Sequence, residues 1–175
     1  MNYDTIIIGA GAAGLMCAGE HTGRTLLIDH IKAPGEKIRI SGGGRCNFTN
    51  LYSSPENFLS HNQHFSKSAL SRYTQWDFIE LVKRYKIEYH EKTLGQLFCD
   101  GSSKQIIEML LTQLHKTNTE LKLSCIVRNL RKIETGFELI LEENNIQTNV
   151  KTKQLVIATG GKSIPKMGAT GFAYD

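Results

Sequence analysis

The chain opens with a short apolar segment that runs directly into a glycine-rich turn. Residues Tyr3–Ile8 are rich in isoleucine and end at a glycine, as is typical of a buried strand. Gly9, Gly11 and Gly14 follow with the spacing G-x-G-x-x-G. Between a strand and a helix, this spacing is typical of the turn that holds a dinucleotide pyrophosphate. The sequence therefore predicts a Rossmann-type βαβ unit at its start.

Each position of this turn has a physical role. Gly9 permits the tight exit from the strand, Gly11 leaves room for the pyrophosphate, and Gly14 lets the next helix pack closely against the strand. That helix is expected from about Ala12 to His21. Its first amides, including that of Ala13, then point toward the phosphates with the positive end of the helix dipole.

An acidic residue stands where the ribose of an adenosine is expected. The apolar run Leu26–Ile28 ends at Asp29, which lies twenty residues after Gly9. A carboxylate at this offset accepts hydrogen bonds from both ribose hydroxyls and repels a 2′-phosphate. The alternative, a flexible glycine turn without a ligand, does not explain the strand, the helix and the acidic residue together.

A second glycine-rich loop indicates which dinucleotide is bound. It covers residues 41–47, and its candidate cofactor contacts are Ser41, Gly43, Gly44, Arg45, Cys46 and Asn47. Bare backbone in this loop predicts close approach to a flavin ring, so the expected cofactor is FAD. Cations at Arg45 and Lys37 are candidates to neutralise pyrophosphate charge or to flank the flavin, although surface cations are commonly only solvated.

Two other residues of the second loop leave alternatives open. Cys46 has no partner in a C-x-x-C motif, so a packing role is favoured over a redox role. Asn47 is a candidate donor to a flavin carbonyl, and an Asx-turn explains it equally well. A third glycine-rich strand exit, at Thr159 and Gly160, follows the apolar run 155–158 and predicts a further backbone contact at the same sheet edge.

The remaining chain predicts ordinary elements around these loops. Apolar periodicity predicts helices at residues 74–85, with Trp76 as a packing residue, and at residues 104–115. Residues 35–50 are predicted to be irregular. Short alternating runs at residues 121–127, 136–141 and 147–150 predict a small antiparallel β-meander.

Composition limits the partners that the sequence predicts. The 175 residues carry a formal charge of +4 with scattered basic residues, so nucleic acid is not expected as a partner. Four separated cysteines and the absence of a signal peptide or transmembrane run favour a cytoplasmic protein without a membrane or metal site. A small-molecule substrate is expected. No catalytic side chain is identified, because a flavin itself would carry the redox chemistry.

Three strings of residues also resemble a known family. They are Asp4–Ala18, the run Gly35–Asn50 with its core Ser41-Gly42-Gly43-Gly44-Arg45-Cys46-Asn47, and Leu155–Pro165. The chain resembles the bacterial YhiN/BaiN-type (HI0933-like) family of NAD(P)/FAD-dependent oxidoreductases along nearly its whole length.

The resemblance implies a fold and an activity. The implied fold is an α/β Rossmann-like FAD-binding domain of glutathione-reductase type with an antiparallel excursion at about 121–150. The implied activity is hydride transfer between a small organic substrate, or NAD(P)H, and non-covalently bound FAD. The position matching the family's backbone contact to adenine is Val127.

Two departures from the family pattern raise a rival hypothesis. Ala173 stands where the family has a glycine, and family members continue well beyond Asp175. Residues 1–175 are therefore expected to be one incomplete FAD-binding domain that retains FAD weakly. The rival from a different class is a non-catalytic module that binds a dinucleotide and turns nothing over.

Overall fold

The computed structural model describes residues 1–161, which form two compact units. The first unit contains Met1–Ile38 and the chain from Leu110 onward, and the second contains Arg39–Met109. Ala173 lies outside the described residues.

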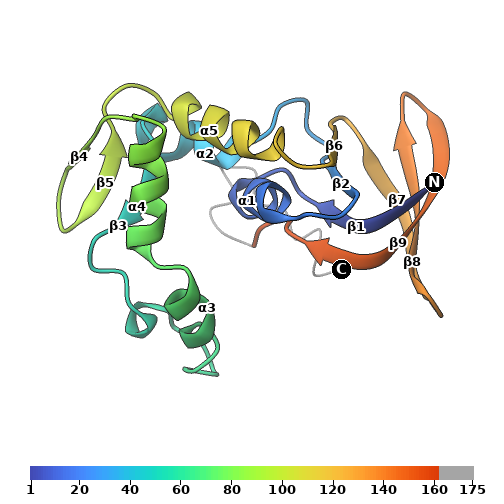
Figure 1. Cartoon of the computed structure of the whole chain (residues 1–175), viewed down its shortest axis with the longest axis horizontal. Coiled ribbons are helices and arrows are strands. Elements are labelled where there is room, and N and C mark those ends of the chain that lie inside the picture. Colours follow the sequence, from blue (N-terminus) through green and yellow to red (C-terminus); the bar gives the residue numbers. More distant parts are fainter. Residues whose placement is uncertain (162–175) are drawn as a thin grey trace. The chain divides into compact units, whose positions relative to one another are not determined.

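The first unit is built on a six-stranded mixed sheet with the order β6-β2-β1-β9-β8-β7 (Figure 1). Strands β6, β2, β1 and β9 run parallel, while β8 and β7 continue the sheet in antiparallel pairs. The strands are β1 (Asn2–Ile8), β2 (Thr25–Ile28), β6 (Thr119–Lys122), β7 (Ile126–Ile133), β8 (Gly136–Glu143) and β9 (Ile146–Ile157).

The parallel part of this sheet forms because its central strands are apolar on both faces. Ile6 and Ile7 of β1 and Leu26 and Leu27 of β2 are fully buried. Helix α1 (Ala12–Glu20) connects these two strands, as the crossover between parallel neighbours requires. The predicted α/β Rossmann-like fold is confirmed.

Turn residues with left-handed backbone set the antiparallel hairpins. Asn144 and Asn145 have φ of 51° and 62°, the pair of positive values that a two-residue type I′ turn needs between β8 and β9. Gly136, at the start of β8, has φ of 140°, and a Cβ there would lie 2.1 Å from the Thr152 carbonyl oxygen. Only glycine fits this position.

Two predicted strand boundaries in this unit were wrong. Residues 121–127 were predicted as one strand, but the chain divides them between β6, which pairs with β2, and β7, which pairs with β8. Ser124, with φ of 53°, turns the backbone between the two. Residues 147–150 and 155–158 were predicted as separate strands. Residues 147–150 and 155–157 belong to one strand, β9, because it pairs with β8 along its first part and with β1 along its second.

The second unit has a three-stranded antiparallel sheet with the order β3-β5-β4. Its elements are α2 (Glu36–Ile40) and α5 (Lys104–Leu114) at its two chain boundaries, the 3₁₀ turns η1 (Ser41–Gly44) and η2 (Pro55–Asn57), helices α3 (Lys67–Arg72) and α4 (Gln75–Arg84), and strands β3 (Asn47–Asn50), β4 (Tyr89–Glu91) and β5 (Gln96–Cys99). The irregular segment predicted at residues 35–50 was wrong, because α2, η1 and β3 lie there. Pairing with β5 makes a strand of a sequence that lacks a strand pattern.

The predicted helix at residues 74–85 is confirmed as α4, but the role predicted for its tryptophan was wrong. Thr74 caps the helix by accepting a hydrogen bond from the Asp77 amide, and Asp77 returns one to the Thr74 amide. Ile79, Leu81 and Val82 form the buried side of the helix. Trp76 is 55% exposed because it lies off that side.

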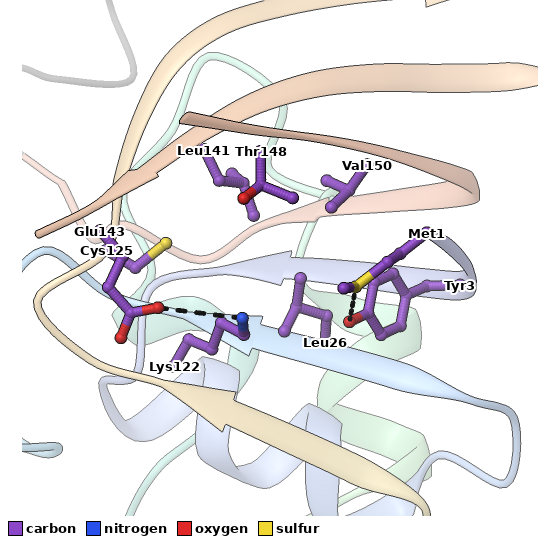
Figure 2. Close-up of a pocket in the computed structure, with 9 residues that line it drawn as sticks. All are labelled: Met1, Tyr3, Leu26, Lys122, Cys125, Leu141, Glu143, Thr148 and Val150. Atoms are coloured by element: carbon purple, nitrogen blue, oxygen red, sulfur yellow. Dashed lines mark hydrogen bonds and ion pairs between the residues drawn. The ribbon is translucent and has the colours of Figure 1, made fainter. Parts of the chain in front are cut away.

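A cavity of about 20 Å³ lies inside the first unit, between the parallel and antiparallel parts of the sheet (Figure 2). Tyr3, Leu26, Cys125 and Leu141 are among the side chains that line it. This volume suits about one water molecule and excludes a dinucleotide. The Tyr3 hydroxyl lies 4.0 Å from the Met1 sulfur and donates a 2.7 Å hydrogen bond to Glu120.

Ionisation of Tyr3 should lower the stability of the fold at high pH. Burial, followed by the hydrogen bond to Glu120, raises the Tyr3 pKa from 10.0 to about 12. The unfolded chain ionises this phenol first, so its contribution to the free energy of unfolding is complete below pH 10 and is lost as the pH rises toward 12. Tyrosinate absorbance should show one phenol titrating near 12, absent in Tyr3→Phe. A Tyr3 that titrates near 10 would contradict its burial.

Candidate functional site

The carboxyl ends of three parallel strands meet at one edge of the first unit. The Gly9 amide donates a 2.8 Å hydrogen bond to the Ile28 carbonyl, and the Ala158 amide donates one of the same length to the Ile8 carbonyl. These bonds join the ends of β2, β1 and β9. In α/β sheets ligands bind at this edge.

The three glycines of the first loop have different surroundings. A Cβ on Gly9, whose φ is 109°, would lie 2.4 Å from the Ala158 carbonyl oxygen, and a Cβ on Gly14 would lie 1.8 Å from the Gly9 carbonyl oxygen. Both positions therefore exclude any side chain. A Cβ on Gly11 meets nothing within 4 Å. The fold itself does not require a glycine at position 11, but a ligand against the loop would.

Helix α1 begins at this open space. Its first intrahelical bond joins the Leu15 amide to the Gly11 carbonyl at 2.9 Å, so the amides of Ala12, Ala13 and Gly14 precede the helical ladder. Ala12 and Ala13 are exposed. Exposed amides at a helix N-terminus, beside a glycine with room around it, fit a pyrophosphate.

Asp29 lies at the end of β2 and already holds the first loop. One oxygen of its carboxylate accepts a 2.7 Å hydrogen bond from the Ala10 amide, and the other accepts one of 3.2 Å from the Ile31 amide. His30 Nδ1 lies 3.2 Å from the second oxygen, and the Asp29 side chain is 10% exposed. Each carboxylate oxygen has a second acceptor site, so the group can take ribose hydroxyls while it orders the loop.

Two further candidates lie on the first unit near this edge. A Cβ on Gly160, whose φ is 80°, would lie 3.2 Å from Lys37 Nζ, which places the ammonium beside the exit from β9. Val127 is half-buried and follows Cys125, whose amide donates a 2.9 Å hydrogen bond to the Asp29 carbonyl. The structure therefore brings Lys37 and Gly160 together, and it places Val127 two residues after a neighbour of Asp29.

The second glycine loop belongs to the second unit and is a left-handed turn. Gly42, Gly43 and Gly44 have φ of 57°, 66° and 86°. The turn is closed by a 3.1 Å hydrogen bond from the Cys46 amide to the Ser41 carbonyl. A Cβ on Gly42 would lie 2.6 Å from the Phe98 ring, while Gly43 and Gly44 have nothing within 4 Å. Gly43 and Gly44 therefore offer bare backbone to a ligand.

Two residues that hold this loop were missed in the sequence. The Cys99 amide donates a 3.0 Å hydrogen bond to the Arg45 carbonyl, and the Ser103 amide donates one of 2.8 Å to the Gly44 carbonyl. The Ser103 hydroxyl donates to the Arg39 carbonyl at 2.9 Å. The position of Ser103 just before the predicted helix at residues 104–115 is typical of a helix cap, but its long-range partners follow only from the fold.

The side chains of the second loop differ in access. Cys46 is buried, and burial raises the pKa of its thiol, while Ser41 partly opposes this shift. The Asn47 amide nitrogen, in the orientation that satisfies both its atoms, donates to the carbonyls of Thr49 and Leu97 at 3.1 and 3.2 Å. Arg45 is exposed. Cys46 and Asn47 therefore support the loop and its strand.

The described residues contain no helix long and apolar enough to cross a membrane, and no group of three or more His, Cys, Asp or Glu that could hold a metal ion.

Residues 3–175 match the family described as the HI0933-like protein Rossmann domain. The chain is 55% identical over 175 residues to the ribosomal RNA dihydrouridine synthase of Escherichia coli K12, and 48% identical to the protein of the same name from Haemophilus influenzae. It is 21% identical to the 3-dehydro-bile acid delta(4,6)-reductase of Clostridium scindens. These matches cover 96–98% of the chain but only 41–44% of the length of each relative.

Solved structures share the fold at low sequence identity. A 3-ketosteroid-delta4-(5alpha)-dehydrogenase from Rhodococcus jostii matches with a TM-score of 0.67 and 14% identity, over 92% of this chain and 46% of that one. An E. coli quinol fumarate reductase subunit FrdA matches with a TM-score of 0.64 and 14% identity, over 93% and 33%.

These relatives overturn one prediction. Nucleic acid was excluded as a partner because the net charge is mild and the basic residues are scattered. Two relatives at 55% and 48% identity are named for action on ribosomal RNA, so that exclusion was wrong. Net charge describes the whole chain, whereas recognition of one base depends on a local surface.

The different surroundings of Gly11 and Gly14 give a matched pair of variants. Gly11→Val should keep the fold and abolish FAD binding, because its side chain enters the open space at the helix start. Gly14→Ala should destabilise the fold by about 1–3 kcal/mol, since its Cβ meets the Gly9 carbonyl. Thermal unfolding and FAD titration separate the two effects. Unchanged FAD affinity in Gly11→Val would show that the loop is only structural.

Asp29→Ala should weaken FAD binding by about ten- to a hundredfold, which corresponds to about 1.5–3 kcal/mol for charge-assisted hydrogen bonds to ribose. The variant also loses the bonds to the Ala10 and Ile31 amides, so its affinity should be compared at a temperature where both proteins are folded. The measurement is FAD fluorescence quenching. A loss below about threefold would contradict the ribose assignment.

Proposed function

The chain belongs to the HI0933-like Rossmann domain family, and from this premise we propose that it forms the FAD-binding part of a flavin-dependent oxidoreductase. The observation that carries the proposal is the open space at Gly11. At Gly9 and Gly14 a side chain would clash with the backbone, so the fold itself requires glycine there. At Gly11 a side chain would clash with nothing in the chain, so we infer that the space is left for a ligand. It lies at the start of α1, on the edge where Asp29 also lies.

Each part of FAD is assigned to a different group of candidate residues. Gly9, Gly11, Ala12, Ala13 and Gly14 hold the pyrophosphate, with Lys37 as a neutralising cation. Asp29 holds the adenosine ribose, and the Val127 backbone contacts the adenine. The loop Ser41–Asn47 is assigned to the flavin, and Thr159 and Gly160 supply backbone at the end of β9. Residues 1–175 act as one FAD-binding domain with an antiparallel excursion.

We propose a uridine base of ribosomal RNA as the substrate. FAD, when bound, supplies two-electron chemistry as hydride transfer. Dihydrouridine is uridine with its C5–C6 double bond saturated, and that bond is conjugated to the C4 carbonyl. The bile-acid enzyme among the relatives is also named for a double bond conjugated to a ketone. The relatives' names thus share reduction of an activated carbon–carbon double bond, and the higher identity favours uridine.

The electron donor and the location complete the proposal. NAD(P)H is the proposed donor, and the cytoplasm is the proposed compartment because all four cysteines are free. The rival function is a dinucleotide-binding module without turnover. Because the chain spans 43% of the E. coli relative, cofactor binding and turnover need separate tests.

The cofactor is tested on the chain itself. The purified chain, incubated with FAD and separated from free ligand, should be yellow, and NADPH or NADH should bleach it under anaerobic conditions. Gly11→Val is the matched control and should stay colourless. A yellow chain that neither pyridine nucleotide bleaches would favour the non-catalytic module.

The substrate is tested by replacement in the E. coli relative. Residues 1–175 replace the matching segment of that protein in a strain lacking it, and dihydrouridine in ribosomal RNA is measured by mass spectrometry. We expect the replacement to restore dihydrouridine and the same replacement carrying Gly11→Val to fail. A folded, FAD-loaded replacement that restores none would contradict uridine as the substrate.

A further inference from the structure

A partly exposed histidine–aspartate pair lies on the small sheet of the second unit. His90 of β4 places its Nδ1 2.5 Å from an oxygen of Asp100, which follows β5. The two side chains are 41% and 49% exposed. Among residues 1–161, no other hydrogen bond of the His90 ring is found, so Nε2 is available to a ligand.

The sheet register places this pair in line with the second glycine loop. Phe98 of β5 lies opposite His90 on one side and opposite Asn47 on the other. Residues opposite one another in antiparallel strands share a face of the sheet and lie about 5 Å apart. Asn47, Phe98 and His90 therefore form a row across one face, which spans about 10 Å.

Phe98 connects the row to the loop by direct packing. Its ring lies 2.6 Å from the position of a Cβ on Gly42, so the loop backbone is in contact with the ring. The His90 ring is stacked against Phe98 with centroids 6.3 Å apart and an interplanar angle of 19°. Lys92 Nζ lies 5.2 Å from the centre of the same ring. One buried aromatic ring thus separates the histidine from the glycine loop.

The proposed reaction needs a proton donor, and none had been assigned. Saturating the C5–C6 bond of uracil adds a hydride to one carbon and a proton to the other. Imidazole is the side chain whose ordinary titration lies nearest neutral pH, which suits a general acid. The thiols nearby are less suited, because Cys46 and Cys99 are buried, and burial raises the Cys99 pKa to about 11.

We propose that His90, held by Asp100, is the general acid that protonates the substrate carbon; this rests on the proposed function. Reduced FAD, once bound, would supply the hydride for C6 of the uracil, and the electron pair of the double bond would move to C5, where the C4 carbonyl stabilises it. The Nε2–H bond of His90 breaks as the C5–H bond forms. Neutral imidazole remains, with its Nδ1–H donated to Asp100.

The test is single turnover by the FAD-loaded hybrid protein, in which residues 1–175 replace the matching segment of the E. coli relative. The flavin is reduced with dithionite without oxygen and mixed with single-stranded oligouridylate, and dihydrouridine is measured by mass spectrometry. His90→Gln should slow product formation about a hundredfold or more, while FAD affinity and flavin reduction by NADPH stay unchanged. Asp100→Asn should slow it less. His61→Gln, an exposed histidine of the same unit, should leave it unchanged.

Two readouts separate proton transfer from a structural role. Added imidazole should restore turnover to His90→Ala, which a packing defect would not allow. In the oxidised FAD-loaded chain, where nothing reacts, the ring nitrogen resonances of His90 should shift when dihydrouridine 5′-monophosphate is added, and those of His61 should not.

Each contrary outcome removes a different part of the proposal. Equal product formation by the wild type and His90→Gln, or absence of the resonance shift, overturns the role of His90 and leaves the proposed function standing. Loss of product in Cys99→Ala, with His90→Gln active, assigns the proton to the thiol and also overturns it. A reduced hybrid protein with unaltered residues 1–175 that makes no dihydrouridine removes the uridine substrate and the histidine role together.

Discussion

The contact between helix α1 and strand β1 determines the geometry of the first unit. Gly14 approaches the Gly9 carbonyl so closely that a Cβ would lie 1.8 Å from its oxygen. This approach places the start of the helix next to the end of β1, and it leaves Ala12 and Ala13 exposed. The Asp29 carboxylate then fixes the intervening loop through the Ala10 amide. The geometry of the candidate cofactor edge therefore follows from contacts within the chain itself.

Patterns formed by neighbouring residues made much of this fold predictable from the sequence. Glycine spacing predicted the first βαβ unit, and apolar spacing predicted α4, because each pattern acts within a few neighbouring residues. The left-handed turn at Gly42–Gly44 and its anchors at Cys99 and Ser103 were not predictable in the same way. Their hydrogen bonds join segments more than fifty residues apart. Trp76 was misjudged because helical spacing does not tell which side of a helix is covered.

The exclusion of nucleic acid failed for a related reason. It used the charge of the whole chain, but a modified base is recognised by the few groups that touch it. The row Asn47–Phe98–His90 illustrates how residues far apart in the sequence reach one face of a sheet, since β3, β5 and β4 each contribute one side chain. No sequence window contains this arrangement. Family membership supplied the information that composition could not.

Strand β9 belongs to both the parallel and the antiparallel part of the sheet in the first unit. One of its ends is antiparallel to β8 and the other is parallel to β1, immediately before Thr159 and Gly160. A slip of one residue at the β8–β9 hairpin would move the strand by about 3.3 Å and turn every side chain to the opposite face. The Asn144–Asn145 turn thus fixes the register of β9, and with it the position of Thr159 and Gly160 beyond the other end of the strand. An insertion or deletion in this hairpin would therefore be tolerated only if each side chain of β9 stayed on the same face of the sheet.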